Sequence, residues 1–375
     1  MKFSSLQENL KQAVSIVSHI AGKNQNLPIL SNIKIEAKDG NISFIATDLE
    51  IGIVHKIRGK IEKEGAYTVD AKLIYDYISL LPANKKVKIE KKDPFLNIES
   101  ESYKTKIKGI EAEEYPLIPE FKNDLSWTIN AKDLRQSLSQ VVFAVSNSDT
   151  RIELTGVLFA FGNNSLTLVA TDSHRLTEKT IKAKQNKNKK TETGNIIVPA
   201  RTLQELLRIL SNLNESEGQE IEIHVNDNQI MFIINQTELV SRLIEGQFPD
   251  YKQIIPTNHK TKAIASRNEL IRAVKASSLF SQDKICDISL DFPKNQNKIL
   301  VSAVSAQKGE SIAEVEAIIN GNDNGVTINY RYLLDGFNNI DTENIIIEII
   351  DSNTPCLIKP ENDDSYIYIV MPIKQ

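Results

Sequence analysis

Cysteine and histidine are scarce in this 375-residue chain, and their scarcity excludes several kinds of site. The two cysteines, Cys286 and Cys356, stand far apart and form no paired motif, which argues against a disulfide framework and a zinc site. The five histidines include no His-x-x-x-His pair on which a metal site could begin. We therefore expect neither a metal nor a cofactor.

Long apolar runs are also missing. No segment approaches the length needed to cross a bilayer, and the N-terminal stretch MKFSSLQENLKQAV lacks the uninterrupted apolar core of a signal peptide. With 41% hydrophobic and 25% charged residues, the composition is typical of a globular protein of two or three domains. We expect a cytoplasmic protein without a membrane partner.

The chain has no overall excess of positive charge. Its net charge of −4 argues against a protein that holds nucleic acid by bulk electrostatics alone. The six helices predicted below nevertheless carry more basic than acidic side chains, so the rest of the chain is strongly acidic. If repeats place these helices on one surface, that surface would attract a polyanion.

One phrase occurs three times: a β-type run, then a basic residue at the start of an apolar-periodic helix. Its copies are YTVDAKLIYDYISLLP (Tyr67–Pro82), IIVPARTLQELLRIL (Ile196–Leu210) and VTINYRYLLDGFNNI (Val326–Ile340). The matched basic residues are Lys72, Arg201 and Arg331. Because they are spaced by about 130 residues, each copy belongs to a unit of domain size.

Each unit opens with a second predicted helix and fills the remaining length with alternating strand-like runs. The opening helices are SSLQENLKQAVSIVSHI, NAKDLRQSLSQVVFAVS and SRNELIRAVKASSLFS. The units therefore read as three similar α+β domains, with boundaries that give residues 1–123, 124–257 and 258–375. A Lys/Asn-rich segment, Lys182–Asn195, interrupts the middle unit and is predicted to be a loop.

Asp172, His174 and Arg175 crowd the end of a predicted strand in ATDSHRL, which is a pattern that a hydrolase could use. The first unit repeats the motif as ATDLEIG, where Asp48 is followed by neither His nor Arg. A residue repeated without its catalytic partners is better explained as a turn device whose carboxylate accepts backbone N–H groups. No nucleophile elbow or phosphate-binding loop accompanies the trio, so a hydrolase that uses Asp172 and His174 is the weaker hypothesis.

The sequence closely resembles the bacterial DNA polymerase III beta subunit family, the sliding clamps, over essentially its whole length. The motifs that carry the resemblance are MKF at the start, LPIL (Leu27–Leu30), ATDLE (Ala46–Glu50), ATDSHRL (Ala170–Leu176), FPDY (Phe248–Tyr251) and YIVMPIK (Tyr368–Lys374). The resemblance implies three similar DNA-clamp domains per chain, with helices lining the inside of a ring and antiparallel sheets outside. It also implies a homodimer and no catalytic activity.

The function implied is that of a processivity factor: a homodimeric ring that encircles duplex DNA without sequence specificity. The implied partners are the replicative polymerase subunit, the clamp loader, other polymerases and repair proteins, each docking a short linear peptide. A non-replicative peptide-binding scaffold of the same fold is the alternative within the family. By family position and charge, the DNA-facing residues would be Lys23, Asn24, Lys72, Arg151 and Arg201, although the family often has Arg where Asn24 stands.

The resemblance also implies a hydrophobic peptide-binding groove beside the turn that holds Asp172. Its predicted residues are Leu154, Thr171, Ser173, His174, Arg175, Leu176, Pro249, Ile254, Val370, Met371, Pro372 and Ile373. Met371 would give a deformable wall, and Pro249 and Pro372 would stiffen the rim. The family commonly has Gly where Ser173 stands and often Arg where Gln253 stands.

Two strand-like segments are suited to joining protomers. SYKTKIKG (Ser102–Gly109) places basic side chains on alternate residues, and GESIAEVEA (Gly309–Ala317) does the same with acidic ones. Pairing of these edges would continue a sheet between chains. The predicted interface residues are Lys104, Lys106, Ile107, Leu279, Phe280, Glu310 and Glu314.

Overall fold

The computed structural model describes residues 1–375 except 23–26, 119–120, 122–124, 187–193, 213–217, 283–284 and 375. Lys23, Asn24 and the centre of the predicted Lys/Asn-rich loop therefore lie outside the described residues. The chain divides into two compact units. The first comprises residues 1–131, 185–191 and 208–243, and the second comprises 132–184, 192–207 and 244–375.

Six α-helices lie in the described residues, at the places that the apolar periodicity predicts. They are α1 (Gln7–Val17), α2 (Ala71–Leu80), α3 (Ala131–Val141), α4 (Ala200–Ser211), α5 (Arg267–Ser278) and α6 (Tyr330–Asn338). Lys72, Arg201 and Arg331 each occupy the second position of their helix, as the repeat predicts. The side chain of Asp70 accepts a hydrogen bond from the Leu73 N–H and begins α2, and Asn329 does the same for Arg331 of α6.

The strands of the first unit form two antiparallel sheets. Their bounds are β1 (Lys2–Leu6), β2 (Asn32–Lys38), β3 (Asn41–Thr47), β4 (Ile51–Ile57), β5 (Lys60–Lys63), β6 (Gly65–Asp70), β7 (Lys86–Lys92), β8 (Phe95–Ser100), β9 (Tyr103–Lys108), β10 (Leu125–Asn130), β16 (Glu220–Val225), β17 (Gln229–Ile234) and β18 (Thr237–Arg242). One sheet has the order β5-β1-β7-β8-β9, which leaves β9 at its edge. The other runs from β10-β16-β17-β18 directly into β4-β3-β2-β6.

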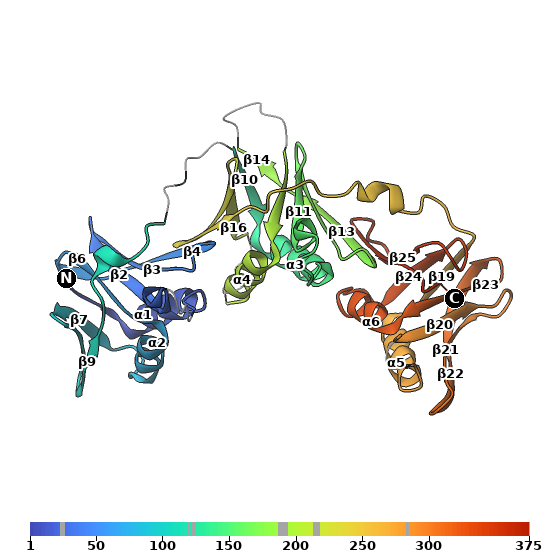
Figure 1. Cartoon of the computed structure of the whole chain (residues 1–375), viewed down its shortest axis with the longest axis horizontal. Coiled ribbons are helices and arrows are strands. Elements are labelled where there is room, and N and C mark those ends of the chain that lie inside the picture. The colour runs from blue at the N-terminus through green and yellow to red at the C-terminus, as the bar shows by residue number, and fades with distance from the viewer. Residues whose placement is uncertain are drawn as a thin grey trace. The chain divides into compact units, whose positions relative to one another are not determined.

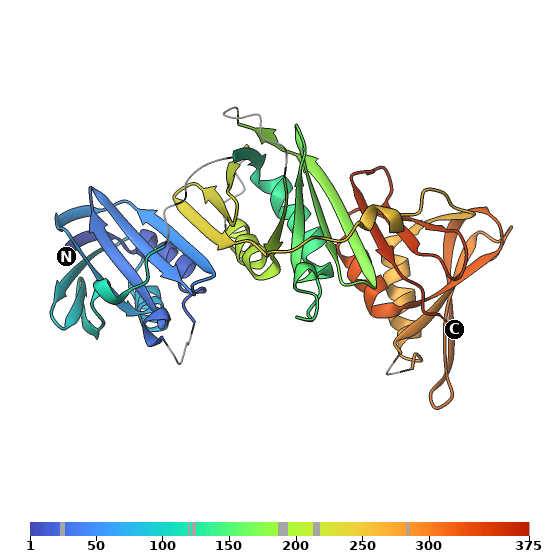
Figure 2. The same cartoon turned by 45° about the horizontal axis from the view of Figure 1, so that its top comes forward.

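The join between β18 and β4 links the first and middle repeats by a continuous strand ladder (Figure 2). Along this ladder Lys56 forms an ion pair of 2.6 Å with Glu238, and His55 Nδ1 lies 2.8 Å from Thr237 Oγ1. The Arg208 guanidinium donates to the carbonyls of Ser15 and Ile16 at the end of α1. Polar side chains therefore reinforce the main-chain pairing on both sides of the sheet.

The second unit contains one larger antiparallel sheet. Its strands are β11 (Gly156–Phe161), β12 (Ser165–Thr171), β13 (Arg175–Lys182), β15 (Asn195–Pro199), β19 (Thr261–Ser266), β20 (Asp287–Phe292), β21 (Lys298–Ser305), β22 (Gly309–Gly321), β23 (Asn324–Asn329), β24 (Asn344–Ile349), β25 (Cys356–Pro360) and β26 (Tyr366–Val370). The order is β15-β11-β12-β13-β26-β25-β24-β19-β22-β21-β20-β23. The division between the units falls within β14 (Lys184–Gln185).

Helices α5 and α6 lie side by side and bury their apolar faces against the C-terminal sheet (Figure 1). Leu270, Val274, Leu333 and Phe337 are completely buried there. A Cβ at Gly336 of α6 would overlap the Tyr368 ring, so glycine allows β26 to approach the helix closely. None of the helices in the described part of the chain has both the length and the apolar character needed for a membrane span.

Candidate functional site

The turn between β12 and β13 is built by side chains that bind the backbone. Asp172 Oδ1 accepts hydrogen bonds from the N–H groups of His174 at 2.9 Å and Arg175 at 3.0 Å. Asp48 Oδ1 accepts from Glu50 and Ile51 in the same way in the first repeat. The prediction that both aspartates are strand-end turn devices is confirmed, and it accounts for Asp172 without catalysis.

Ser173 adopts a left-handed backbone conformation at the tip of this turn, with φ of +77°. Leu49, its counterpart in the first repeat, has φ of +80°. The Ser173 N–H donates to Thr171 Oγ1 at 3.1 Å, and Thr171 Oγ1 donates to the Arg175 carbonyl at 2.7 Å. Because only glycine adopts this conformation without strain, the glycine that the resemblance implies here has a backbone reason.

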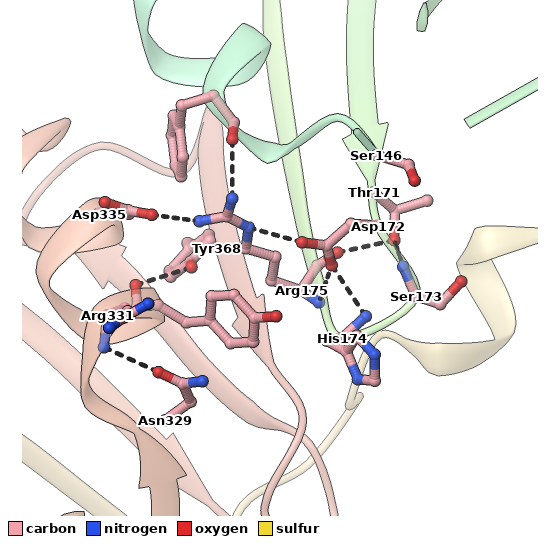
Figure 3. A network of polar contacts seen from close by, with 12 residues as sticks. Ser146, Thr171, Asp172, Ser173, His174, Arg175, Asn329, Arg331, Asp335 and Tyr368 are labelled. Carbon is pink, nitrogen blue, oxygen red and sulfur yellow. Dashed lines mark hydrogen bonds and ion pairs between the residues drawn. The ribbon is translucent and has the colours of Figure 1, made fainter. Parts of the chain in front are cut away.

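Arg175 is buried beneath the turn and is not exposed at its rim (Figure 3). Its guanidinium donates to the carboxylates of Asp172 at 3.0 Å and Asp335 at 2.5 Å, and to the Phe143 carbonyl at 2.9 Å. The Tyr332 ring lies beneath it at 4.8 Å from the centroid. Arg175 therefore joins the middle repeat to helix α6.

His174 is exposed beside this network. Its ring lies nearly parallel to that of Tyr332, with centroids 6.3 Å apart. Its carbonyl accepts the Met371 N–H at 2.8 Å, while the Ile373 N–H donates to Thr327 at 2.8 Å. The C-terminal segment is thus tied to the turn, which places Met371 close to His174.

Leu176 faces the opposite side of the sheet from Arg175. It packs in an apolar cluster with Leu158, Val169, Tyr251, Leu357 and Ile369, which we call the Leu176 cluster. Partly buried Phe248, Ile255 and Ile367 border it. Burial and an interaction with Glu178 raise the pKa of Tyr251, so its hydroxyl stays neutral and brings no charge into the cluster.

The structure brings some predicted groove residues together and places two of them, Arg175 and Val370, on the face of the sheet opposite to Leu176. Thr171, Ser173 and His174 share the turn, and the His174 carbonyl accepts the Met371 N–H. Ile254 is 40% exposed on the 3-10 helix Tyr251–Ile254, which begins at Tyr251 of the Leu176 cluster. Leu154 is buried on the 3-10 helix Ile152–Leu154, and Pro249, Pro372 and Ile373 are partly exposed. Val370 is completely buried in a core cluster that does not include Leu176.

Sequence reasoning missed Ile369, Tyr251 and Tyr332. Ile369 pairs with Leu176 across β13 and β26, so these two side chains share a face, whereas Val370 shares the face of Arg175. The strand-like sequence YIYIV (Tyr366–Val370) already indicates that Ile369 and Val370 face opposite sides of a sheet, because successive residues of a strand alternate. Tyr251 lies in the FPDY motif, but no pattern in the sequence brings Tyr332 to His174.

The first repeat has a glycine at the position that Leu176 occupies in the middle repeat. Gly52 stands four residues after Asp48, where Leu176 stands after Asp172. A Cβ at Gly52 would lie 2.9 Å from Ile118 Cδ1, so the segment that leaves the first repeat covers this position itself. The repeat therefore supplies the turn twice but the leucine only once.

Comparisons with known proteins identify the family. Models of the DNA polymerase III beta subunit match along the chain: the N-terminal domain at residues 1–119, the central domain at 128–250 and the C-terminal domain at 252–374. This chain belongs to the DNA polymerase III beta subunit family. The predicted family and the predicted three-domain clamp fold are confirmed.

Curated relatives match most of this chain. The beta sliding clamps of Staphylococcus epidermidis and Staphylococcus aureus are each 29% identical over 358 residues, which cover 93% of this chain and 92% of each relative. A sliding clamp structure from Pseudomonas aeruginosa with ligand has a TM-score of 0.93 at 26% identity and 100% coverage of both chains. That from Bacillus subtilis has 0.92 at 27%, covering 100% of this chain and 99% of that one.

The family is the non-catalytic sliding clamp, an accessory subunit of DNA polymerase III. Its identity supports DNA and polymerase partnership and ring assembly in general terms. The alternative of a hydrolase centred on Asp172 and His174 has no support, because the Asp172 carboxylate is bound by backbone amides and Arg175. In the described residues no group of three His, Cys, Asp or Glu side chains is placed to hold a metal.

Three of the five predicted DNA-facing residues, Lys72, Arg151 and Arg201, lie in the part of the chain that the structure describes. Lys72 is exposed on α2 and forms an ion pair of 2.9 Å with Asp76, and Arg201 is exposed on α4. Arg151 Nε donates to Glu153 at 2.9 Å, and its NH1 lies 3.4 Å from Ser173 Oγ. Arg151 therefore sits at the turn of the candidate groove, and its assignment to DNA stays a prediction.

Five of the seven predicted interface residues lie on the strands β9 and β22, and Leu279 and Phe280 follow helix α5. Lys104 and Lys106 are exposed on the edge strand β9, whereas Ile107 is buried. Glu310 and Glu314 are exposed on the part of β22 that pairs with β21 on one side, and Glu314 contacts Lys298 at 2.6 Å. Leu279, just after α5, is 69% exposed, and Phe280 is partly buried.

Proposed function

We propose that this beta subunit is the sliding clamp of its replicative DNA polymerase and acts as a homodimeric ring that encircles duplex DNA. The full-length match of three clamp domains is the observation that carries the proposal. The proposed domains are residues 1–123, 124–257 and 258–375. A closed ring is retained by topology, so the modest basic charge of its helices suffices for contacts that slide and weaken with salt.

The ring would close where β9 of one protomer meets β22 of the next. Lysines stand on one free edge and glutamates on the other, so the pairing would continue a sheet with complementary charge. Leu279 supplies exposed apolar area near the glutamate edge. The exposed Lys72 and Arg201 would contact phosphates in the channel.

The proposed groove docks short linear peptides of the polymerase, the clamp loader and repair proteins. Its floor is the Leu176 cluster and its wall is formed by His174 and Met371, which a backbone hydrogen bond holds together. Burial of one leucine or phenylalanine contributes about 1.5–3 kcal/mol. Two or three such anchors, less ordering costs, give an affinity on the order of micromolar, which suits partners that exchange.

Peptide capture tests the groove. A fluorescein-labelled C-terminal peptide of the same organism's polymerase subunit should bind the chain with micromolar affinity, and a chain that ends at Val370 should lose the binding. A chain that ends at Ile373 is the matched control and should bind normally. Equal binding by both truncated chains would remove the proposed groove.

Polymerase run length separates the clamp from a non-replicative scaffold. The clamp should lengthen the products of the polymerase on primed circular DNA after loading. A scaffold of the same fold would capture the peptide without lengthening them. Sedimentation should give the mass of a dimer.

A further inference from the structure

We infer that Arg175 is a positioning residue of the proposed groove and not a peptide contact. It fixes the Asp172–His174 turn, which forms one wall of the groove, against helix α6. This inference rests on the proposed function, because it states how the groove wall is held in place.

The side of the sheet on which Arg175 lies argues against direct recognition. Its side chain lies on the face of the sheet opposite to that of Leu176 and Ile369. A peptide that packs on Leu176 and Ile369 would meet the other side of β13. The guanidinium is also held from three directions, because each of its three nitrogens donates to a different acceptor.

The three acceptors come from segments that are far apart in the chain (Figure 3). Asp172 belongs to the turn, the Phe143 carbonyl to the short helix Val142–Ala144 after α3, and Asp335 to α6. Only the planar fork of arginine reaches three such groups in fixed directions. A lysine at this position would bind one or two of them and release the rest.

The network extends to the exposed wall of the groove. The Tyr332 ring contacts the Arg175 guanidinium at 4.8 Å and lies nearly parallel to the His174 ring. The His174 carbonyl in turn holds Met371. Displacement of Asp335 or Arg175 should therefore shift His174 and Met371, although Asp335 itself lies on α6.

Lys179 offers a matched control on the same strand. It is also buried and also joins the middle repeat to the C-terminal one, through Asp363 at 2.9 Å and Ser365 at 2.7 Å. It lies four residues along β13 from Arg175, away from the turn. Loss of this tie should weaken the join between repeats without disturbing the wall.

The experiment compares Arg175→Lys, Asp335→Asn and Lys179→Met by anisotropy with the labelled polymerase C-terminal peptide. Arg175→Lys and Asp335→Asn should each raise the Kd about three- to tenfold, and the double variant should add little to Arg175→Lys, since both act through one network. Lys179→Met should lower the melting temperature but leave the Kd within about twofold of wild type.

Amide chemical shifts supply a second readout that needs no peptide. In Asp335→Asn the N–H resonances of Ser173 and His174 should move, and in Lys179→Met they should not. If wild type fails to bind the peptide, the proposed function is lost, while these shifts still decide the role of Arg175. An Asp335→Asn variant with wild-type Kd and unmoved resonances would overturn the inference, whereas a loss of affinity confined to Arg175→Lys would make Arg175 a direct contact.

Discussion

Asp48 and Asp172 show how far single residues can be interpreted from this sequence. Their roles at the turns were predictable because the repeat presents the same aspartate with and without its neighbours. The partners of Arg175 were not predictable, since Asp335 lies 160 residues away in the chain. Because Arg175 is buried, it links two segments inside the protein and does not place a charge at the rim of the groove.

Ser173 and Leu49 give a prediction about backbone strain. Replacement of Ser173 by Gly should raise the free energy of unfolding by about 0.5–1 kcal/mol. A backbone φ of +77° strains any residue with a Cβ, and relief of this strain should exceed the extra conformational entropy that glycine loses on folding. Urea denaturation measures the change. Ser102→Gly, at an exposed turn position without positive φ, should change stability in the opposite direction, and a loss of stability in Ser173→Gly would refute the strain argument.

His55 makes the β4–β18 join sensitive to acid. Burial lowers the pKa of His55 to about 4, from about 6.5 in the unfolded chain. The folded state therefore binds a proton at His55 less readily than the unfolded chain does. The free energy of unfolding should be highest above pH 6.5 and should fall as the pH drops towards 4, by about 3 kcal/mol in all. Urea midpoints measured between these values should show the decline.

His55→Gln should remove much of this pH dependence, because glutamine cannot take up the proton. His19→Gln, at an exposed position of the same repeat, is the control and should retain it. An unchanged pH profile in His55→Gln would assign the acid sensitivity to other groups.

At the scale of elements, the helices were predictable and the strand partners were not. The 3.6-residue spacing of apolar side chains within one segment predicts both a helix and its buried face, and all six described helices follow that pattern. Strand pairing depends on partners distant in sequence, so nothing local indicated that β4 continues into β18 or β13 into β26. The placement of Val370 in the groove failed at this scale too, because pairing with β13 decides which face of β26 meets Leu176.

The free edges of β9 and β22 lead to a prediction about assembly. Lys106→Glu should weaken the dimer about three- to tenfold, and addition of Glu310→Lys should restore part of that loss because the charges again complement each other. Sedimentation at several concentrations gives the dissociation constants. Lys88→Glu, an exposed change on the interior strand β7, should have little effect, and failure of the double variant to recover would argue against this edge pairing.

At the scale of the whole molecule, the family resemblance predicted the function, and the repeat and the segregation of charge agreed with it. Three copies of one unit, with basic residues at matched helix starts, are what a surface that follows a regular polyanion requires. The sequence could not supply the continuity of the sheets, on which a rigid ring depends. In the structure, strand ladders continue from each repeat into the next.

Retention on DNA tests the ring most directly. The chain, loaded by the same organism's clamp loader onto nicked circular DNA, should stay bound through gel filtration in high salt and should leave when the circle is cut once. Escape at equal rates from the circular and the linear DNA would show that contacts rather than topology hold it, and would contradict the proposed clamp.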